Sequence, residues 1–316
     1  MEKKQHICEF FDSRGLALQG GELSKAIAAN GISDVSITLM PGRCGSTIIA
    51  NYARNYGFGR GAELFNELSE TMLRQETEGN TPQAYFNKVV ESGSLNGRLY
   101  FQITPNRLKK LLSAASADSL RAMSPTVTLI LRRDVFAQAL SFYNAVHSGI
   151  WHSRQQPFRG AASARLDWRK PLANLRSRLG RVVGQSRPVG TGEAPELDRI
   201  SKWVGQILRS ERDAFTVMDM IGVRPAAILF YEDIATSPVA AMIAFLAANG
   251  QTADVARIVA AIEAKSNVTR LARPDAAAQY AAMSTSLPGF HALCQLRQRD
   301  PLAGATYQAF SDHGYL

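Results

Sequence analysis

The segment that most constrains the fold of this chain is "SITLMPGRCGST", residues 36–47. Residues 35–40 are mostly apolar and typical of a buried strand, and they run directly into Pro-Gly-Arg-Cys-Gly-Ser-Thr. Residues 46–55 then have the pattern of a helix. When a strand, a glycine-containing turn and a helix follow one another, several backbone N–H groups meet at the positive end of the helix. The segment therefore predicts an α/β fold with an anion-binding loop.

Five residues of this loop have the chemistry that an anion site needs. Gly42 and Gly45 let the backbone approach an anion where a Cβ atom would obstruct it. Arg43 adds positive charge, and Ser46 and Thr47 add hydroxyl groups from the first helical turn. The alternative is an ordinary strand-to-helix turn in which Ser46 is the N-cap. From these residues alone, both interpretations stay open.

Two well-known nucleotide-binding loops are absent from this segment. A triphosphate-binding loop requires Gly-x-x-x-x-Gly-Lys-Ser/Thr, in which the lysine neutralises the outer phosphates, and that lysine is missing here. The Gly-x-Gly-x-x-Gly loop of dinucleotide-binding folds is missing too. The segment therefore does not have the pattern of an ATP, GTP or NAD site.

The rest of the chain alternates between strand and helix patterns. Further strands are expected at 97–102, 126–131 and 226–231. Helices are expected at roughly 46–55, 63–76, 105–116, 134–148, 198–221, 238–248 and 253–264. This alternation predicts a three-layer α/β fold, in which helices cover both faces of a central parallel sheet.

A second stretch, "LILRRDVFAQALSFYNAVHSGIWH", places Arg132 at the end of a strand and then opens another helix. Asp134 can cap that helix, which is apolar nearly all round and is therefore expected to be buried. Gln138, Ser141 and Asn144 form a narrow polar stripe on it that needs partners. We expect Arg132 and Ser141 to meet a second phosphate. The alternative is that Arg132 pairs with Asp134 and Ser141 bonds a carbonyl one turn back.

The net charge of +9 is concentrated in one part of the chain. Between residues 152 and 188 there are nine arginines and lysines against the single acid Asp167. We interpret about 153–195 as a basic, mobile insertion within one domain, 34–316, and residues 1–33 as an N-terminal extension. A charge of this size suggests nucleic acid or an anionic surface as a partner. However, the sequence has neither a basic groove with interleaved aromatic residues nor a known DNA-binding module. A solvated loop is the alternative interpretation.

Composition narrows the class of protein further. With 316 residues and 46% hydrophobic side chains, the chain can bury a substantial core. It has neither a signal-peptide pattern nor an apolar run long enough for a membrane span, and its three cysteines are far apart without metal-ligand spacing. We therefore expect a cytoplasmic protein without a bound metal.

Together, the two stretches resemble the bacterial carbohydrate sulfotransferases, the family that includes the mycobacterial trehalose sulfotransferase. The resemblance rests on Pro-Gly-Arg-Cys-Gly-Ser-Thr after the first strand and on Arg-Arg-Asp-x-x-x-Gln-Ala-x-Ser-x-x-x-Ala later. It runs from about residue 35 to 233, with a weaker echo to about 270. It implies a P-loop NTPase-like α/β fold and the transfer of a sulfuryl group from 3′-phosphoadenylyl sulfate (PAPS) to an acceptor hydroxyl.

The resemblance assigns ligand contacts to particular residues. The 3′-phosphate contacts fall on Arg132 and Ser141, and Trp151 matches an aromatic residue that closes the segment. Arg98 occupies a strand position at which the family tends to be basic, and it is expected to assist the bridging oxygen or the acceptor. The Tyr-Glu-Asp turn at 231–233 resembles the family's strand-end acidic turn. The phosphosulfate contacts fall on Gly42, Arg43, Cys44, Gly45, Ser46 and Thr47, with Cys44 standing where serine is usual.

The resemblance also implies a carboxylate base. In the family a glutamate follows the first helix in a Gly-x-Pro-x-Glu-aromatic-Phe context, and this chain has Gly-Arg-Gly-Ala-Glu-Leu-Phe at 59–65. Glu63 is therefore the expected base, acting with Arg43 in catalysis. The alternative is a solvent-facing acid at the start of a helix. His147 and His152 are the fallback bases.

Three classes of function follow as alternatives. The first is a PAPS-dependent sulfotransferase with a carbohydrate or glycolipid acceptor, which releases 3′,5′-bisphosphoadenosine and forms a homodimer by resemblance. The second is a nucleotide-dependent kinase on a related fold, which the missing lysine disfavours. The third is a non-enzymatic binder of nucleic acid or anionic surfaces that uses the basic insertion.

Overall fold

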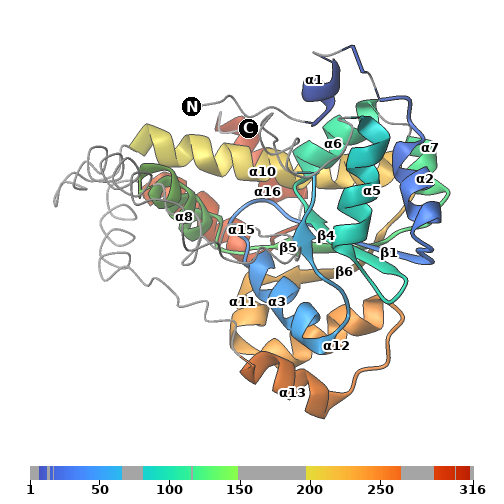
Figure 1. Cartoon of the computed structure of the whole chain (residues 1–316). Helices are drawn as coiled ribbons and strands as arrows, with labels where there is room; N and C mark the ends of the chain where they lie inside the picture. The colour runs from blue at the N-terminus through green and yellow to red at the C-terminus, as the bar shows by residue number, and fades with distance from the viewer. Residues whose placement is uncertain are drawn as a thin grey trace, which may run out of the picture.

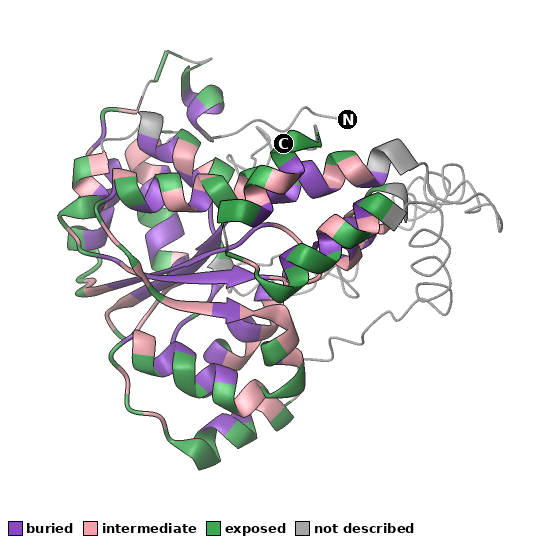
Figure 2. Cartoon of the chain, turned by 180° about the vertical axis from the view of Figure 1, so that it is seen from behind, coloured by how far each residue is buried: buried purple, intermediate pink, exposed green. Residues whose placement is uncertain are grey.

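The computed structural model describes residues 7–12, 15–16, 18–65, 81–114, 117–148, 197–264, 288–302 and 304–313. A central sheet runs through the middle of the molecule, with helices packed above and below it in the view of Figure 1. Figure 2 shows the central strands of the sheet almost entirely buried, as their apolar runs require.

The described sheet has six strands, five of which are parallel. Their order is β2 (Ala62–Glu63), β4 (Arg98–Ile103), β1 (Asp34–Leu39), β5 (Thr126–Leu131) and β6 (Pro225–Phe230). A short strand, β3 (Ser94–Leu95), pairs antiparallel with β4. Each of the four predicted strands is found within one residue of its expected bounds, and the α/β class with a parallel sheet is confirmed.

Helices cover both faces of the sheet and one of its ends (Figure 1). One face carries α1 (Ile7–Asp12), α2 (Glu22–Ala29), α5 (Pro82–Gly93), α6 (Pro105–Ala114), α7 (Ala117–Arg121) and the end of α10 (Leu197–Met220). The other face carries α3 (Ser46–Tyr56), α11 (Tyr231–Thr236), α12 (Pro238–Ala248) and α13 (Val255–Glu263). A third cluster joins the start of α10 to α8 (Val135–Ser148), α15 (Pro288–Arg299) and α16 (Gly304–Asp312).

The predicted helices agree with the structure to within two residues, except one. The helix expected at 63–76 is wrong at its first residue, because Glu63 lies in β2 and pairs in parallel with Gln102 of β4. Most of the remaining range falls outside the described residues. The insertion expected at 153–195 also lies outside them.

The described residues before β1 are built into the main core. Phe11 of α1 is fully buried and lies in the same apolar cluster as Leu99 and Phe101 of β4. Its ring meets the ring of Tyr85 of α5 edge-on. Helix α1 therefore packs with the helices of this layer.

The connections after β1 and β4 leave the sheet on opposite sides. These strands are parallel neighbours, but β1 is followed by α3 on one face and β4 by α6 on the other. Ligands of open α/β sheets bind outside the carboxyl ends of the strands at such a switch point. The loop that follows β1 therefore lies where ligands of such folds bind.

Candidate active site

The loop between β1 and α3 bends through two left-handed residues. Arg43 has φ +65° and Gly45 has φ +82°, and α3 begins directly after Gly45 at Ser46. A left-handed conformation costs a non-glycine residue about 1 kcal/mol, so Arg43 is held there by its surroundings. Such alternation of backbone conformation directs successive N–H groups toward one point. Since the N-cap is Gly45, the alternative in which Ser46 caps the helix is wrong.

Both glycines are needed because aromatic rings pack against the loop. A Cβ atom on Gly42 would collide with the ring of Phe142 of α8, and one on Gly45 would collide with the ring of Tyr231 of α11. The loop is therefore enclosed by the elements that follow β5 and β6.

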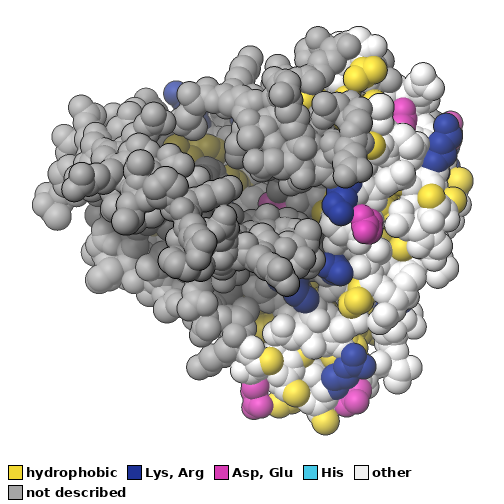
Figure 3. Space-filling model, viewed as in Figure 1, with side chains coloured by type: hydrophobic (Ala, Val, Ile, Leu, Met, Phe, Trp, Pro, Cys, Tyr) yellow, Lys and Arg dark blue, Asp and Glu magenta, His cyan; other side chains and the backbone are white. Residues whose placement is uncertain are grey.

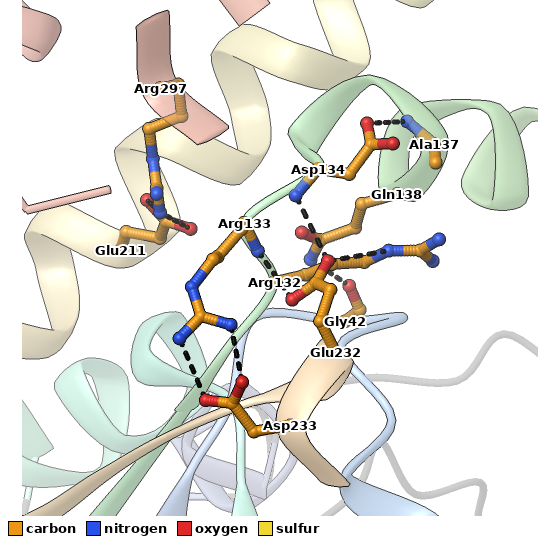
Figure 4. A network of polar contacts seen from close by, with 10 residues as sticks. All are labelled: Gly42, Arg132, Arg133, Asp134, Ala137, Gln138, Glu211, Glu232, Asp233 and Arg297. Carbon is orange, nitrogen blue, oxygen red and sulfur yellow. Dashed lines mark hydrogen bonds and ion pairs between the residues drawn. The ribbon is translucent and has the colours of Figure 1, made fainter. Parts of the chain in front are cut away.

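Two residues of the polar stripe predicted on α8, Gln138 and Ser141, find partners in this loop. Gln138 is fully buried and its Nε2 donates to the carbonyl oxygen of Gly42 at 2.7 Å (Figure 4). Arg43 donates from Nε to Ser141 Oγ at 3.0 Å. The two sequence motifs, expected to grip opposite ends of one donor, thus contact each other directly and form one site.

Arg132 follows β5 and reaches the same place. Its side chain is 18% exposed, and its guanidinium carbon stands 4.6 Å from the centre of the Tyr231 ring. Its Nε lies 3.9 Å from Glu232 Oε1, and among the described residues this buried atom has no hydrogen-bond partner. A buried N–H donor without a partner is uncommon in folded proteins and marks Arg132 as available to an anion.

The two residues after Arg132, Arg133 and Asp134, have partners other than Arg132. Asp134 caps α8, since its Oδ1 accepts from the Ala137 amide at 2.8 Å. Arg133 forms the ion pair, with two hydrogen bonds to Asp233 at 2.7 and 2.8 Å (Figure 4). The alternative in which Arg132 pairs with Asp134 is therefore wrong.

The electrostatics of Arg43 show that two cations share this site. Burial lowers the pKa of the Arg43 guanidinium, and the positive charge of Arg132 lowers that pKa further. Two like charges held together with little solvent repel each other unless an anion lies between or beside them. The arrangement is thus complementary to a negatively charged group.

Glu63 lies at the same edge of the sheet as the loop. Register pairs it with Gln102, and Gln102 pairs with Thr38, one residue before the end of β1. Two strand spacings, about 10 Å in all, therefore separate the Glu63 and Thr38 backbones. The Glu63 side chain is exposed and belongs to a strand, so the alternative of a helix-terminal acid is wrong.

Arg98 does not lie at this site. It begins β4 and pairs in register with Asp34, the first residue of β1, so it stands at the amino edge of the sheet. Its guanidinium forms an ion pair with Asp34 and stacks 4.3 Å from the centre of the Phe58 ring. The expected role beside the bridging oxygen or acceptor is therefore corrected to a structural one. Trp151 and His152 fall outside the described residues, as does the side chain of His147.

Cys44 turns away from the anion-binding face of the loop. It is fully buried in the apolar cluster beneath α3, and burial raises the pKa of its thiol to about 12. Only its backbone can contact a ligand at the loop surface. Replacement of the family's serine by cysteine thus removes no exposed hydroxyl here.

Two supporting groups were not anticipated from the sequence. Gln102, the last but one residue of β4, donates from Nε2 to the carbonyl oxygen of Ser46 at 2.9 Å and so holds the first turn of α3. Glu232 accepts hydrogen bonds from the Arg133 and Asp134 amides at 3.0 and 3.2 Å. The signal for Gln102 was a lone amide in an otherwise apolar strand. For Glu232 it was the acidic turn after the last strand.

The surface drawn in Figure 3 carries its described charges in separate places. Lysine and arginine side chains are interspersed with acids on this face, so the described part of it offers no continuous basic groove. No cluster of three or more potential metal ligands occurs among the described residues. None of the described helices is long and apolar enough to cross a bilayer.

Comparison with known proteins gives a family match over part of the chain. Residues 37–177 match the family model described as Stf0 sulphotransferase. The match begins within β1 and extends past α8, so it includes both loop motifs and Glu63. No curated protein matches the chain. The resemblance inferred from the two motifs is confirmed, and with it the P-loop-like fold.

Proposed function

We propose that this chain, a sulfotransferase of the Stf0 type, moves a sulfuryl group from PAPS to an acceptor hydroxyl. The observation that carries the proposal is the meeting of Arg43 and Arg132 from two distant motifs. Their positive charges act on each other, and Arg43 is tied to Ser141 of the second motif. PAPS is a matching ligand because one nucleotide bears both a 3′-phosphate and a 5′-phosphosulfate.

The loop after β1 would hold the phosphosulfate end of the donor. The backbone amides of residues 42–47 and the Arg43 guanidinium supply the donors, and α3 adds its positive end. Arg132 and Ser141 would hold the 3′-phosphate. The fit rests on the Nε of Arg132, a buried donor that has no hydrogen-bond partner among the described residues.

The chemistry follows from where charge develops. The acceptor oxygen forms a bond to sulfur while the bond from sulfur to the bridging phosphate oxygen breaks, so negative charge grows on the departing 3′,5′-bisphosphoadenosine. Arg43 and the loop amides stabilise that charge. The acceptor proton passes to the Glu63 carboxylate, which lies at the carboxyl edge of the sheet and is exposed.

The acceptor and the assembly are proposed on the family resemblance alone. A carbohydrate or glycolipid hydroxyl is the acceptor that the resemblance implies, and a homodimer is the expected assembly. The positive charge of residues 153–195 suits an acidic glycan or membrane surface. If deletion of residues 161–194 left turnover and its salt dependence unchanged, the insertion would have no part in recruiting the acceptor.

Calorimetric titration tests the donor. Tight binding of 3′,5′-bisphosphoadenosine, with no response to ATP and magnesium, supports the proposal, and the reverse pattern would overturn it in favour of a kinase. Arg43→Ala should abolish the binding. Arg54→Ala is the matched control, because Arg54 is an exposed arginine on α3, the helix that follows the loop, and donates to the carbonyl oxygen of Arg60 instead.

Transfer of labelled sulfate from PAPS into a cell extract identifies the acceptor. The product is analysed by mass spectrometry, and a Glu63→Gln variant serves as the negative control. Transfer by Glu63→Gln at the rate of the unmodified chain would remove Glu63 from the mechanism while leaving the donor assignment intact.

A further inference from the structure

We infer that Glu232 is a positioning residue that sets the place of Arg132 through the backbone, an inference that rests on the proposed function. Glu232 lies in the first turn of α11, directly after β6, while Arg132 follows the neighbouring strand β5. The two residues belong to separate segments of the chain, and the carboxylate connects them.

The contacts of Glu232 are with the backbone that carries Arg132. Oε2 accepts from the Arg133 amide at 3.0 Å and Oε1 accepts from the Asp134 amide at 3.2 Å (Figure 4). These two amides follow Arg132 immediately, and Asp134 is the cap of α8. One carboxylate therefore fixes the turn between β5 and α8 at the residue where the Arg132 side chain departs.

Glu232 attracts Arg132 without using up its donors. Its Oε1 is 3.9 Å from Arg132 Nε, beyond hydrogen-bonding distance, and that Nε has no partner among the described residues. The carboxylate is about 29% exposed and directs both oxygens to amides. The guanidinium is thus oriented by charge from one side and by the Tyr231 ring at 4.6 Å, while its hydrogen-bonding capacity is kept for a ligand.

The direction of the effect of Glu232→Gln separates this role from simple charge balance. If Glu232 only neutralised Arg132, its removal would leave more positive charge at the site and would tighten the binding of an anionic donor. If it positions Arg132, the neutral amide loses one of two backbone contacts, because a glutamine NH2 group cannot accept from an N–H. The donor would then bind more weakly.

The experiment measures donor affinity and turnover separately. Glu232→Gln is expected to raise the Kd of 3′,5′-bisphosphoadenosine about tenfold, with kcat at saturating PAPS changed less than threefold. In an Arg132→Ala background the same substitution should have almost no further effect on Kd. Asp233→Asn is the neighbouring control: it removes the Arg133 ion pair but leaves the two amide contacts, so the Kd should stay within threefold.

Two outcomes would overturn the inference. One is tighter or unchanged binding by Glu232→Gln, and the other is an equally large loss in the Arg132→Ala background. If Glu232→Gln proves too unstable to study, Glu232→Asp replaces it. This variant retains the charge on a shorter side chain, and it should raise the Kd above that of the unmodified chain but by less than about tenfold.

Hydrogen exchange distinguishes failure of this inference from failure of the proposed function. Faster exchange at the Arg133 and Asp134 amides in Glu232→Gln supports the positioning role even without a nucleotide, and unchanged exchange refutes it. If the unmodified chain binds no 3′,5′-bisphosphoadenosine, the proposed function fails. The inference is then decided without a nucleotide. The measurements are exchange at these two amides and the weak binding of inorganic sulfate by Glu232→Gln and by its control Asp233→Asn.

Discussion

Two arginines at opposite edges of the sheet are alike in burial and stacking but differ in their hydrogen bonds. Arg98 begins β4 and Arg132 follows β5, their side chains are 16% and 18% exposed, and each lies against an aromatic ring, at 4.3 and 4.6 Å. Arg98 donates from Nε to Asp34 at 2.6 Å, whereas the Nε of Arg132 has no partner within the described ranges. Burial and ring stacking are therefore alike in these two arginines, and the unfilled hydrogen-bonding capacity of Arg132 is what distinguishes it from Arg98.

The surroundings of each arginine explain the contrast. At the amino edge of the sheet, Asp34 and Arg98 face each other in register as the first residues of neighbouring strands. At the carboxyl edge, the Glu232 carboxylate accepts hydrogen bonds from two backbone amides, and a second cation, Arg43, acts on the charge of Arg132. The charge of Arg98 is thus balanced by Asp34 within the protein, while Arg132 shares its surroundings with a second cation, as expected of the anion site proposed above.

The largest effect is expected from removing Arg43. Arg43→Ala should lower kcat/KM for PAPS about a thousandfold, equivalent to about 4 kcal/mol of transition-state stabilisation, because its charge stands where the leaving phosphate becomes more negative. Steady-state kinetics measure the change. Arg43→Gly suits the left-handed backbone better and should be more stable than Arg43→Ala but equally inactive. Activity retained in both would place Arg43 outside the chemistry.

A smaller but clear effect is expected at Arg132. Arg132→Ala should raise the Kd of 3′,5′-bisphosphoadenosine about 30- to 100-fold, because charge-assisted hydrogen bonds to a phosphate contribute about 2–3 kcal/mol. Arg132→Lys should recover only part of that loss, since lysine lacks the planar fork of donors. Calorimetry provides both numbers. An Arg132→Ala variant with unchanged affinity would erase the contrast with Arg98.

Removal of Arg98 should affect the stability of the fold and leave donor binding unchanged, the opposite of what is expected for Arg132. Arg98→Ala should reduce the free energy of unfolding by about 1–2 kcal/mol through loss of a half-buried ion pair and of ring stacking. The Kd of 3′,5′-bisphosphoadenosine should stay within twofold. Urea unfolding and calorimetry on one preparation separate the two effects. A loss of affinity at full stability would return Arg98 to the binding site.

The smallest functional effect is expected at Cys44. Cys44→Ser should leave donor affinity within threefold and cost about 1–2 kcal/mol of stability, because the hydroxyl would be buried among apolar groups. A marked gain in affinity would show that the serine hydroxyl reaches the ligand.

The thiol of Cys44 also makes a prediction about pH. Its folded pKa of about 12 exceeds the ordinary 9.0, so above about pH 9 the unfolded thiol loses its proton while the folded one keeps it. The stability of the folded chain therefore falls as pH rises through that window. Cys44→Ala should make this fall shallower in urea titrations between pH 8 and 10.

The strands and the first loop could be predicted because their signals are local. Apolar runs of six residues gave the central strands, and Pro-Gly-Arg-Cys-Gly-Ser-Thr gave the turn. Strand β2 was missed because two residues are too few for a period, and its pairing with β4 depends on the register of distant segments. The same limit hid the role of Glu232, because the acidic turn is visible in the sequence but its partners are backbone amides about a hundred residues away.

The ring of Tyr231 lies against Gly45 and beneath Arg132, so a single side chain is shared by both motifs. A larger residue at position 45 would push this ring, and the ring would push the guanidinium. Positions 45, 132 and 231 are therefore expected to covary among related sequences, and engineering one of them demands compensation at the other two.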